Sequence, residues 1–193
     1  MGLQFLACFR SGTVVCKPQI RAFLFIVLAW AFNPALADIL SGRVVAISDG
    51  DTVTVLDQHN KQHKIRLAAI DAPEKAQPFG NRAKQYMSNL LYQHTVDVHW
   101  RKYDRYGRIV GKVMVADSAT CLPLELNCPK SVDAGLAQIK AGLAWHYRKY
   151  WKEQSLEDRD AYALAEMEAR AQRLGLWDDV KSVPPWEWRH HRR

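Results

Sequence analysis

Two short stretches of the 193-residue chain bring carboxylates together with a guanidinium among apolar residues. Residues 49–51 read Asp-Gly-Asp, which is typical of a tight turn, and a β-branched run follows directly. Residues 66–74 begin with Arg66, continue as an apolar strand, and carry Asp71 and Glu74 at and just past the strand end. If the two strand ends meet, their carboxylates converge beside Arg66.

Converging carboxylates repel one another unless a cation lies among them. Oxygen ligands suit a hard divalent cation such as calcium or magnesium, and an arginine beside such a cation indicates a shared anion, with phosphate the obvious candidate. Taken alone, Asp-Gly-Asp is more often a solvated turn, and a lone arginine is more often an ion-paired surface residue. A third segment, residues 103–108, adds two arginines and two tyrosines around a glycine and favours the functional interpretation.

Residues 48–53, 65–74 and 104–108 resemble the three signature segments of staphylococcal-nuclease-like (thermonuclease) proteins. They occur in the family's order, and the resemblance extends over roughly residues 40–177. It implies metal-assisted hydrolysis of phosphodiester bonds in DNA and RNA, leaving 3′-phosphate ends. Sequence preference is expected to be weak, because such a site holds the backbone and not the base edges.

The resemblance also implies a metal site for one calcium ion, with magnesium as a substitute. Its protein ligands would be Asp51, Asp71 and the main-chain carbonyl of Ala72. The family commonly has threonine where this chain has Ala72, so a main-chain ligand survives but a hydroxyl contact is lost. Asp49 would be a neighbouring carboxylate that tunes the site without binding the ion.

Three catalytic roles follow from the same resemblance. Glu74 would orient or deprotonate the attacking water, and Arg66 and Arg108 would hold the scissile phosphate and stabilise the charge that develops on it. Losing one such charged contact typically slows the chemical step on the order of a hundredfold.

Aromatic and basic residues extend the expected substrate surface. Tyr106 and Arg105 lie within the third signature segment, and Tyr147 lies in a stretch that mixes rings with cations, as nucleic-acid surfaces do. In that stretch we expect Trp145 to be buried, with Tyr147 and Arg148 near the substrate.

The N-terminal residues 1–37 have the pattern of an export signal. Cations precede an apolar run of 11 residues at 22–32, and an Ala-Leu-Ala cleavage site follows at 35–37. An uncleaved signal anchor is the alternative. Cleavage would leave 156 residues without stable membrane insertion, and the formal charge would fall from +7 to +4, which still favours polyanions.

Only Cys121 and Cys128 remain after the predicted cleavage. In an oxidising compartment the default is one intramolecular disulfide between them. A zinc site is the rival interpretation, but two thiols without nearby histidines supply too few ligands. The cysteines therefore agree with a secreted or periplasmic protein.

The hydrophobic pattern predicts an α+β domain over residues 38–180, namely a five-stranded OB-like β-barrel with about three packed helices. The expected strands are residues 39–48, 51–56, 62–69, 96–100 and 109–115. The expected helices are residues 81–92, residues 131–141 capped by Ser131, and residues 155–174 capped by Ser155. Residues 181–193 form a basic aromatic tail, in which Trp186 or Trp188 is expected to pack while the basic end is solvated.

Two other functional classes compete with the enzyme. One is a non-catalytic OB-fold module that binds nucleic acid or a protein, and the other is a secreted structural or adhesion domain. A degenerate binder would usually have lost at least one site residue, whereas this chain keeps the complete set of Asp51, Arg66, Asp71, Glu74 and Arg108. We therefore expect a monomeric enzyme whose partners are DNA and RNA.

Overall fold

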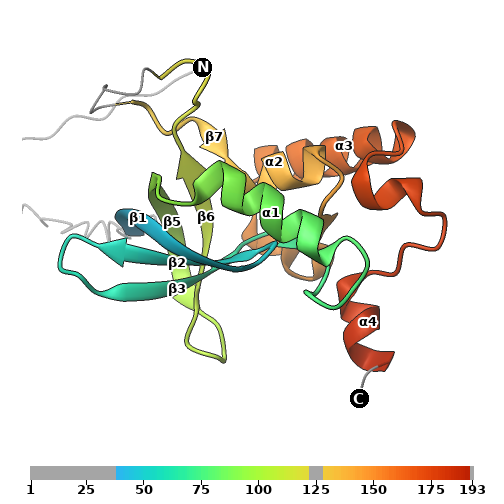
Figure 1. Ribbon diagram of the computed structural model, residues 1–193, viewed down its shortest axis with the longest axis horizontal. Coiled ribbons are helices and arrows are strands. Elements are labelled where there is room, and N and C mark those ends of the chain that lie inside the picture. The colour runs from blue at the N-terminus through green and yellow to red at the C-terminus, as the bar shows by residue number, and fades with distance from the viewer. Residues whose placement is uncertain (1–37, 122–127, 192–193) are drawn as a thin grey trace, which may run out of the picture. The chain divides into compact units, whose positions relative to one another are not determined.

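Five strands close into a mixed β-barrel in the computed structural model, which describes residues 38–121 and 128–191. Their order is β3-β2-β1-β5-β6, and a parallel pairing of β3 with β6 completes the barrel (Figure 1). The strands are β1 (Asp38–Asp49), β2 (Thr52–Asp57), β3 (Gln62–Leu67), β5 (Thr95–Tyr103) and β6 (Ile109–Val115). The predicted α+β class and five-stranded barrel are confirmed.

Alternation of apolar and polar residues explains why these segments form strands around one core. In β6, Ile109, Val113 and Val115 point inward and are buried, while the residues between them are partly exposed, apart from the buried Gly111. The strand residues that fill the barrel are Val44, Val53, Val55, Ile65, Leu67, Val96, Val98, Ile109, Val113 and Val115. Burying each such side chain contributes about 1.5–3 kcal/mol relative to leaving it exposed.

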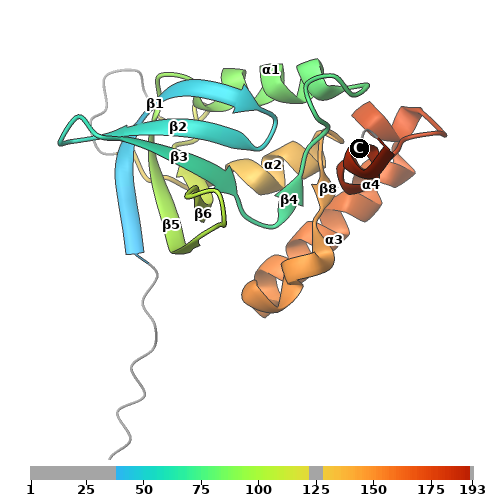
Figure 2. The same cartoon turned by 90° about the horizontal axis from the view of Figure 1, so that it is seen from below.

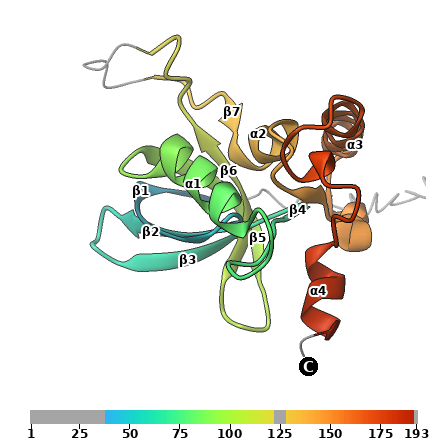
Figure 3. The same cartoon turned by 45° about the vertical axis from the view of Figure 1, so that its right-hand side comes forward.

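Four helices of seven or more residues pack around the barrel in the described part of the chain, where the sequence indicated about three. They are α1 (Gly80–Leu91), α2 (Ala134–Lys140), α3 (Leu156–Ala171) and α4 (Pro185–His191). The additional helix, α4, lies in the predicted tail. In Figures 1 to 3, α4 and the turn between β2 and β3 lie on opposite sides of this domain.

Of the two predicted helix caps, one shifts and one is confirmed. The helix expected from Ser131 starts later, because Val132–Asp133 pairs with β6 as the short strand β7, and Asp133 is the N-cap that accepts hydrogen bonds from the amides of Gly135 and Leu136. The Ser155 cap of α3 is confirmed, since its hydroxyl accepts from the Asp158 amide.

The third predicted strand ends two residues early. β3 stops at Leu67, residues 68–69 form a turn in which Ala69 has a φ of 67°, and β4 (Ile70–Asp71) follows. β4 pairs with β8 (Trp145–His146) in a second, two-stranded sheet (Figure 2). This small sheet joins the second signature segment to the aromatic stretch near residue 147.

Short 3₁₀-helices complete the C-terminal half. η1 (Arg148–Glu153) follows β8, and η2 (Gly175–Asp178) follows α3.

Cys121 and Cys128 form the predicted disulfide, with a Cα–Cα distance of 5.7 Å. The predicted signal peptide lies outside the described residues. Within residues 38–121 and 128–191, no helix is long and apolar enough to cross a membrane.

Candidate active site

The structure brings Asp51 and Asp71 onto one guanidinium, that of Arg66. Nη1 of Arg66 lies 3.0 Å from Oδ2 of Asp51, and Nη2 lies 3.0 Å from Oδ1 of Asp71. Both carboxylates are buried, with 6% and 1% of their surface exposed. Nη1 also donates to the carbonyls of Leu67 and Ile70, so Arg66 fixes the turn as well as the two carboxylates.

Close backbone packing sets the position of Asp51. A Cβ on Gly50 would lie 2.7 Å from the Cβ atoms of Ala72 and Ala83, so only glycine lets the turn approach the second segment this closely. The Ala72 amide donates to Oδ2 of Asp51 over 2.9 Å, and the Asp51 amide donates to Oδ1 of Asp49 over 3.1 Å. The first two signature segments are therefore joined through main-chain hydrogen bonds.

Burial and mutual repulsion make this centre electrostatically unfavourable for negative charge. Burial, together with the neighbouring Asp51, raises the pKa of Asp49 to about 6. Burial also raises the pKa of Asp71, an effect opposed by the hydrogen bond from Arg189 and the charge of Arg66. A cation among these groups would relieve the repulsion.

Glu74 lies in the loop after β4 and is the most accessible of the predicted site carboxylates, with 38% of its side chain exposed. Its amide donates to Oε1 of Gln77 over 3.1 Å, and its own Oε1 accepts a 2.7 Å hydrogen bond from Nη1 of Arg189. The same arginine also contacts Asp71, so Glu74 and Asp71 converge on a shared cation.

Arg108 lies in the turn between β5 and β6. Its Nε donates to Oδ2 of Asp104 over 2.7 Å, and its guanidinium lies 5.5 Å from the ring centroid of Tyr106. In the parallel β3–β6 pairing Arg66 is opposite Val110, two residues after Arg108. The Arg105 guanidinium lies 5.0 Å from the centroid of the same ring.

Tyr147 follows β8, and its amide donates to the carbonyl of Ala69 over 2.7 Å. Its ring packs against Tyr150 and Trp186, with centroid distances of 5.8 and 5.6 Å. Trp145 is buried, as predicted. Arg148, expected near the substrate, contacts the buried Glu166 over 3.1 Å.

The sequence reasoning missed Arg189, which lies in α4 and reaches both Asp71 and Glu74. The sequence does contain a pattern that points to this contact. Trp186 and Arg189 are three residues apart, so a helix would place them on one face, with the ring packed and the guanidinium beside it. The tail was predicted to have a solvated basic end, and Arg189 keeps 43% of its side chain exposed while also contacting both carboxylates.

A divalent cation would have to be held by oxygen atoms of Asp51 and Asp71. In the described part of the chain, no group of three or more carboxylate, histidine or cysteine side chains is close enough to hold a metal ion. The donor chemistry nevertheless fits a hard cation, because two buried carboxylates already share one guanidinium and a second guanidinium bridges Asp71 and Glu74.

Sequence comparison places this chain in a known family. Residues 64–179 match the family model described as "Staphylococcal nuclease homologue". An Escherichia coli protein called "Uncharacterized endonuclease" is 37% identical over 172 residues, which cover 89% of this chain and 99% of that protein. A "Micrococcal nuclease" of Shigella flexneri is 39% identical over 172 residues, covering 88% and 91% of the two chains. The chain therefore belongs to the staphylococcal nuclease family.

Proposed function

We propose that this protein is an exported, metal-dependent nuclease that hydrolyses phosphodiester bonds in DNA and RNA with little sequence preference. The observation that carries the proposal is the convergence of Asp51 and Asp71 on Arg66, at the point where the first two signature segments meet. Membership of a nuclease family supports the reaction class. The 3′-phosphate products and the preference for calcium over magnesium are finer parts of the proposal.

In this mechanism Asp51, Asp71 and the carbonyl of Ala72 hold the metal ion, and Asp49 increases the negative potential around it. The bound cation would supply Lewis-acid activation of the phosphate. Asp51 and Asp71 are already fixed by hydrogen bonds from the Ala72 amide and from Arg66, so the two carboxylates need little rearrangement to act as metal ligands.

Glu74 orients and deprotonates the attacking water. It suits this role because it is more accessible than Asp51 and Asp71 while its backbone is fixed through Gln77. Arg66 and Arg108 hold the phosphate and stabilise the charge that accumulates on its oxygens.

In this proposal the substrate strand follows the surface that carries Arg105, Tyr106 and Arg108, and Tyr147 provides a further contact. Tyr106 is exposed, and the guanidinium groups of Arg105 and Arg108 lie next to its ring, so this segment offers an aromatic and cationic contact for a nucleotide. The Cys121–Cys128 disulfide supports export to the periplasm or the medium, and a single copy of the chain carries every proposed site residue.

The experiment that tests this function compares wild type with Asp51→Asn on labelled single-stranded DNA and RNA, in EDTA and after adding calcium or magnesium. We expect EDTA to stop cleavage, calcium to restore it for wild type, and the variant to stay inactive. Binding without cleavage under every ion would instead assign the protein to the class of non-catalytic nucleic-acid-binding modules.

A further inference from the structure

The C-terminal helix α4 places a cation on the two carboxylates that the proposed reaction needs. Nη2 of Arg189 lies 2.7 Å from Oδ2 of Asp71, and Nη1 lies 2.7 Å from Oε1 of Glu74 and 3.3 Å from Oδ1 of Asp71. These contacts join residues separated by 115 to 118 positions in the chain. One side chain therefore contacts both a proposed metal ligand and the proposed base.

Both carboxylate oxygens of Asp71 accept from Arg189. Oδ1 also accepts from Arg66, and Asp71 is only 1% exposed, so water screens the charges around it very little. A divalent cation bound to either oxygen would lie within a few ångströms of the Arg189 guanidinium, and like charges at that range repel strongly in a partly buried site. Full occupancy by the metal ion and full contact with Arg189 are therefore incompatible.

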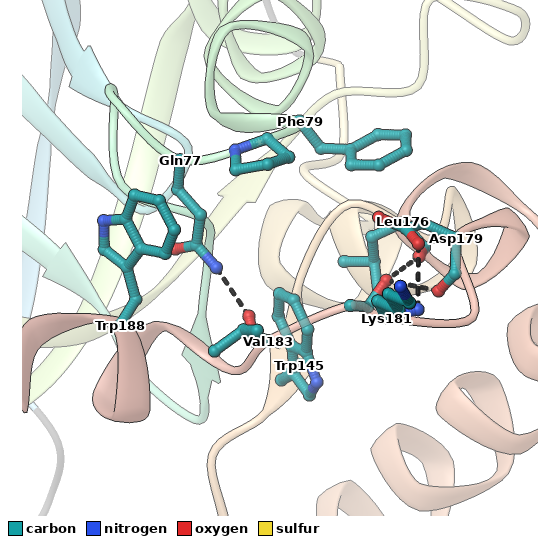
Figure 4. Close-up of a pocket in the computed structure, with 10 residues that line it drawn as sticks. Gln77, Phe79, Trp145, Leu176, Asp179, Lys181, Val183 and Trp188 are labelled. Carbon is teal, nitrogen blue, oxygen red and sulfur yellow. Dashed lines mark hydrogen bonds between the residues drawn. The ribbon is translucent and has the colours of Figure 1, made fainter. Parts of the chain in front are cut away.

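Specific packing holds α4 in this place. The ring of Trp186 lies 6.4 Å from that of Trp145 and 5.6 Å from that of Tyr147. The side-chain amide of Gln77 donates to the carbonyl of Val183 just before the helix (Figure 4). Gln77 also accepts from the Glu74 amide, so the loop that carries the proposed base is tied to the segment that carries Arg189.

The same docking restricts the proposed substrate surface. Trp186 covers part of Tyr147, and Trp188 and Gln77 both line a small hollow between this loop and the segment after α3 (Figure 4). A seven-residue helix is too short to be stable by itself. Its position therefore depends on these contacts and is reversible when a competing ligand replaces the Arg189 contacts.

We propose that α4 is an autoinhibitory strap, in which Arg189 occupies the carboxylate centre as a tethered cation and the divalent metal ion binds in competition with it. This inference rests on the proposed function, because it takes Asp71 as a metal ligand and Glu74 as the base. Metal binding displaces Arg189, and α4 then undocks so that Trp186 no longer covers Tyr147.

Calorimetric calcium titration of the full chain tests the competition without reference to activity. The variants are Arg189→Gln, which removes the tethered cation, and Trp186→Ala, which keeps the cation but removes the packing of α4. Lys61→Gln is the matched control, since it removes one positive charge from the turn between β2 and β3, away from α4 (Figures 1 to 3). Asp51→Asn identifies binding at the proposed centre.

We expect Arg189→Gln and Trp186→Ala to bind calcium about fivefold to tenfold more tightly than wild type, and Lys61→Gln to match wild type. Hydrogen exchange of the α4 amides in wild type should become faster when calcium is added. Unchanged or weaker binding in Arg189→Gln, or unchanged α4 exchange, overturns the strap. Tighter binding in Arg189→Gln alone overturns it too, because only the charge of Arg189 would then matter.

Failure of the strap and failure of the proposed function give different results. If wild type and Arg189→Gln bind calcium equally and Asp51→Asn does not bind it, the strap is wrong and the metal centre stands. If none of the proteins binds calcium, the metal centre itself is wrong and the strap fails with it.

Discussion

Asp71 lies directly opposite Trp145 in the antiparallel pairing of β4 with β8. This pairing links a proposed metal ligand to the ring against which Trp177 and Trp186 pack, at centroid distances of 5.2 and 6.4 Å. The carboxylate centre and the C-terminal aromatic cluster are therefore one structural unit, although they come from opposite halves of the chain.

Arg66→Ala should reduce stability as well as activity. Arg66 is only 15% exposed at its side chain and neutralises Asp51 and Asp71, so its loss leaves two buried carboxylates without their shared partner. Removing one partner of a buried pair typically costs about 3–5 kcal/mol. Chemical denaturation in EDTA measures this cost, and Arg43→Ala, which removes an exposed contact to Gln93, is the control. Equal free energies of unfolding for the two variants would contradict the proposed role of Arg66 in holding the carboxylates.

Arg108→Ala should reduce activity strongly while changing stability little. Arg108 pairs with Asp104 in a partly exposed turn, and such pairs contribute at most about 1 kcal/mol to stability. If Arg108 binds the phosphate in the transition state, turnover should fall on the order of a hundredfold. Steady-state cleavage of a short labelled DNA measures this, with Arg43→Ala, which removes an exposed arginine outside the proposed site, as the control. A near wild-type rate for Arg108→Ala would remove it from the catalytic set.

The pair of Asp57 and His63 predicts an acid-dependent loss of stability. A hydrogen bond from His63, 2.8 Å away, is the main cause that lowers the pKa of Asp57 from 3.8 to about 2. Because this carboxyl has a lower pKa in the folded state, its stabilising contribution is present above pH 3.8 and is lost as the pH falls through 2. Urea unfolding of wild type and Asp57→Asn should therefore differ at neutral pH and converge near pH 2. A difference that stays constant down to that pH would refute this assignment.

Removing the disulfide should lower stability more than activity. Cys121 and Cys128 are separated by seven positions, and closing a loop of this size typically stabilises the folded state by about 2–3 kcal/mol. Neither cysteine contributes to the proposed site. Thermal unfolding and DNA cleavage should be compared for wild type with and without reductant, with the double Cys→Ser variant as the control. A proportional loss of activity below the melting temperature would show that the disulfide positions the site.

Alternation and turn residues predicted the barrel strands because each strand has one buried face. The sequence pattern predicted the ends of helices and strands less well where tertiary contacts determine them. Ser131 was a good cap by residue type, yet pairing of Val132–Asp133 with β6 moved the cap to Asp133. The turn at residues 68–69 was missed because Ala69 adopts a positive φ that local propensity disfavours.

The site residues came from the signature segments, and the structure places Asp51, Arg66 and Asp71 together. The sequence did not indicate that Asp71 and Glu74 would share Arg189, because that contact depends on how α4 packs on Trp145 and Tyr147. The expected metal-binding, catalytic and substrate-binding roles of the site residues all stay predictions, as do the domain boundaries at residues 37 and 180.

The most direct test of the central claim is calcium-dependent cleavage of single-stranded DNA by wild type and by Glu74→Gln, measured in single turnover with saturating enzyme. The substitution keeps the size of the side chain and removes the base. We predict that the variant still binds calcium and DNA, with a cleavage step on the order of a hundredfold slower. Cleavage by Glu74→Gln at the wild-type rate would show that Glu74 is not the base and that the reaction assigned to this site is wrong.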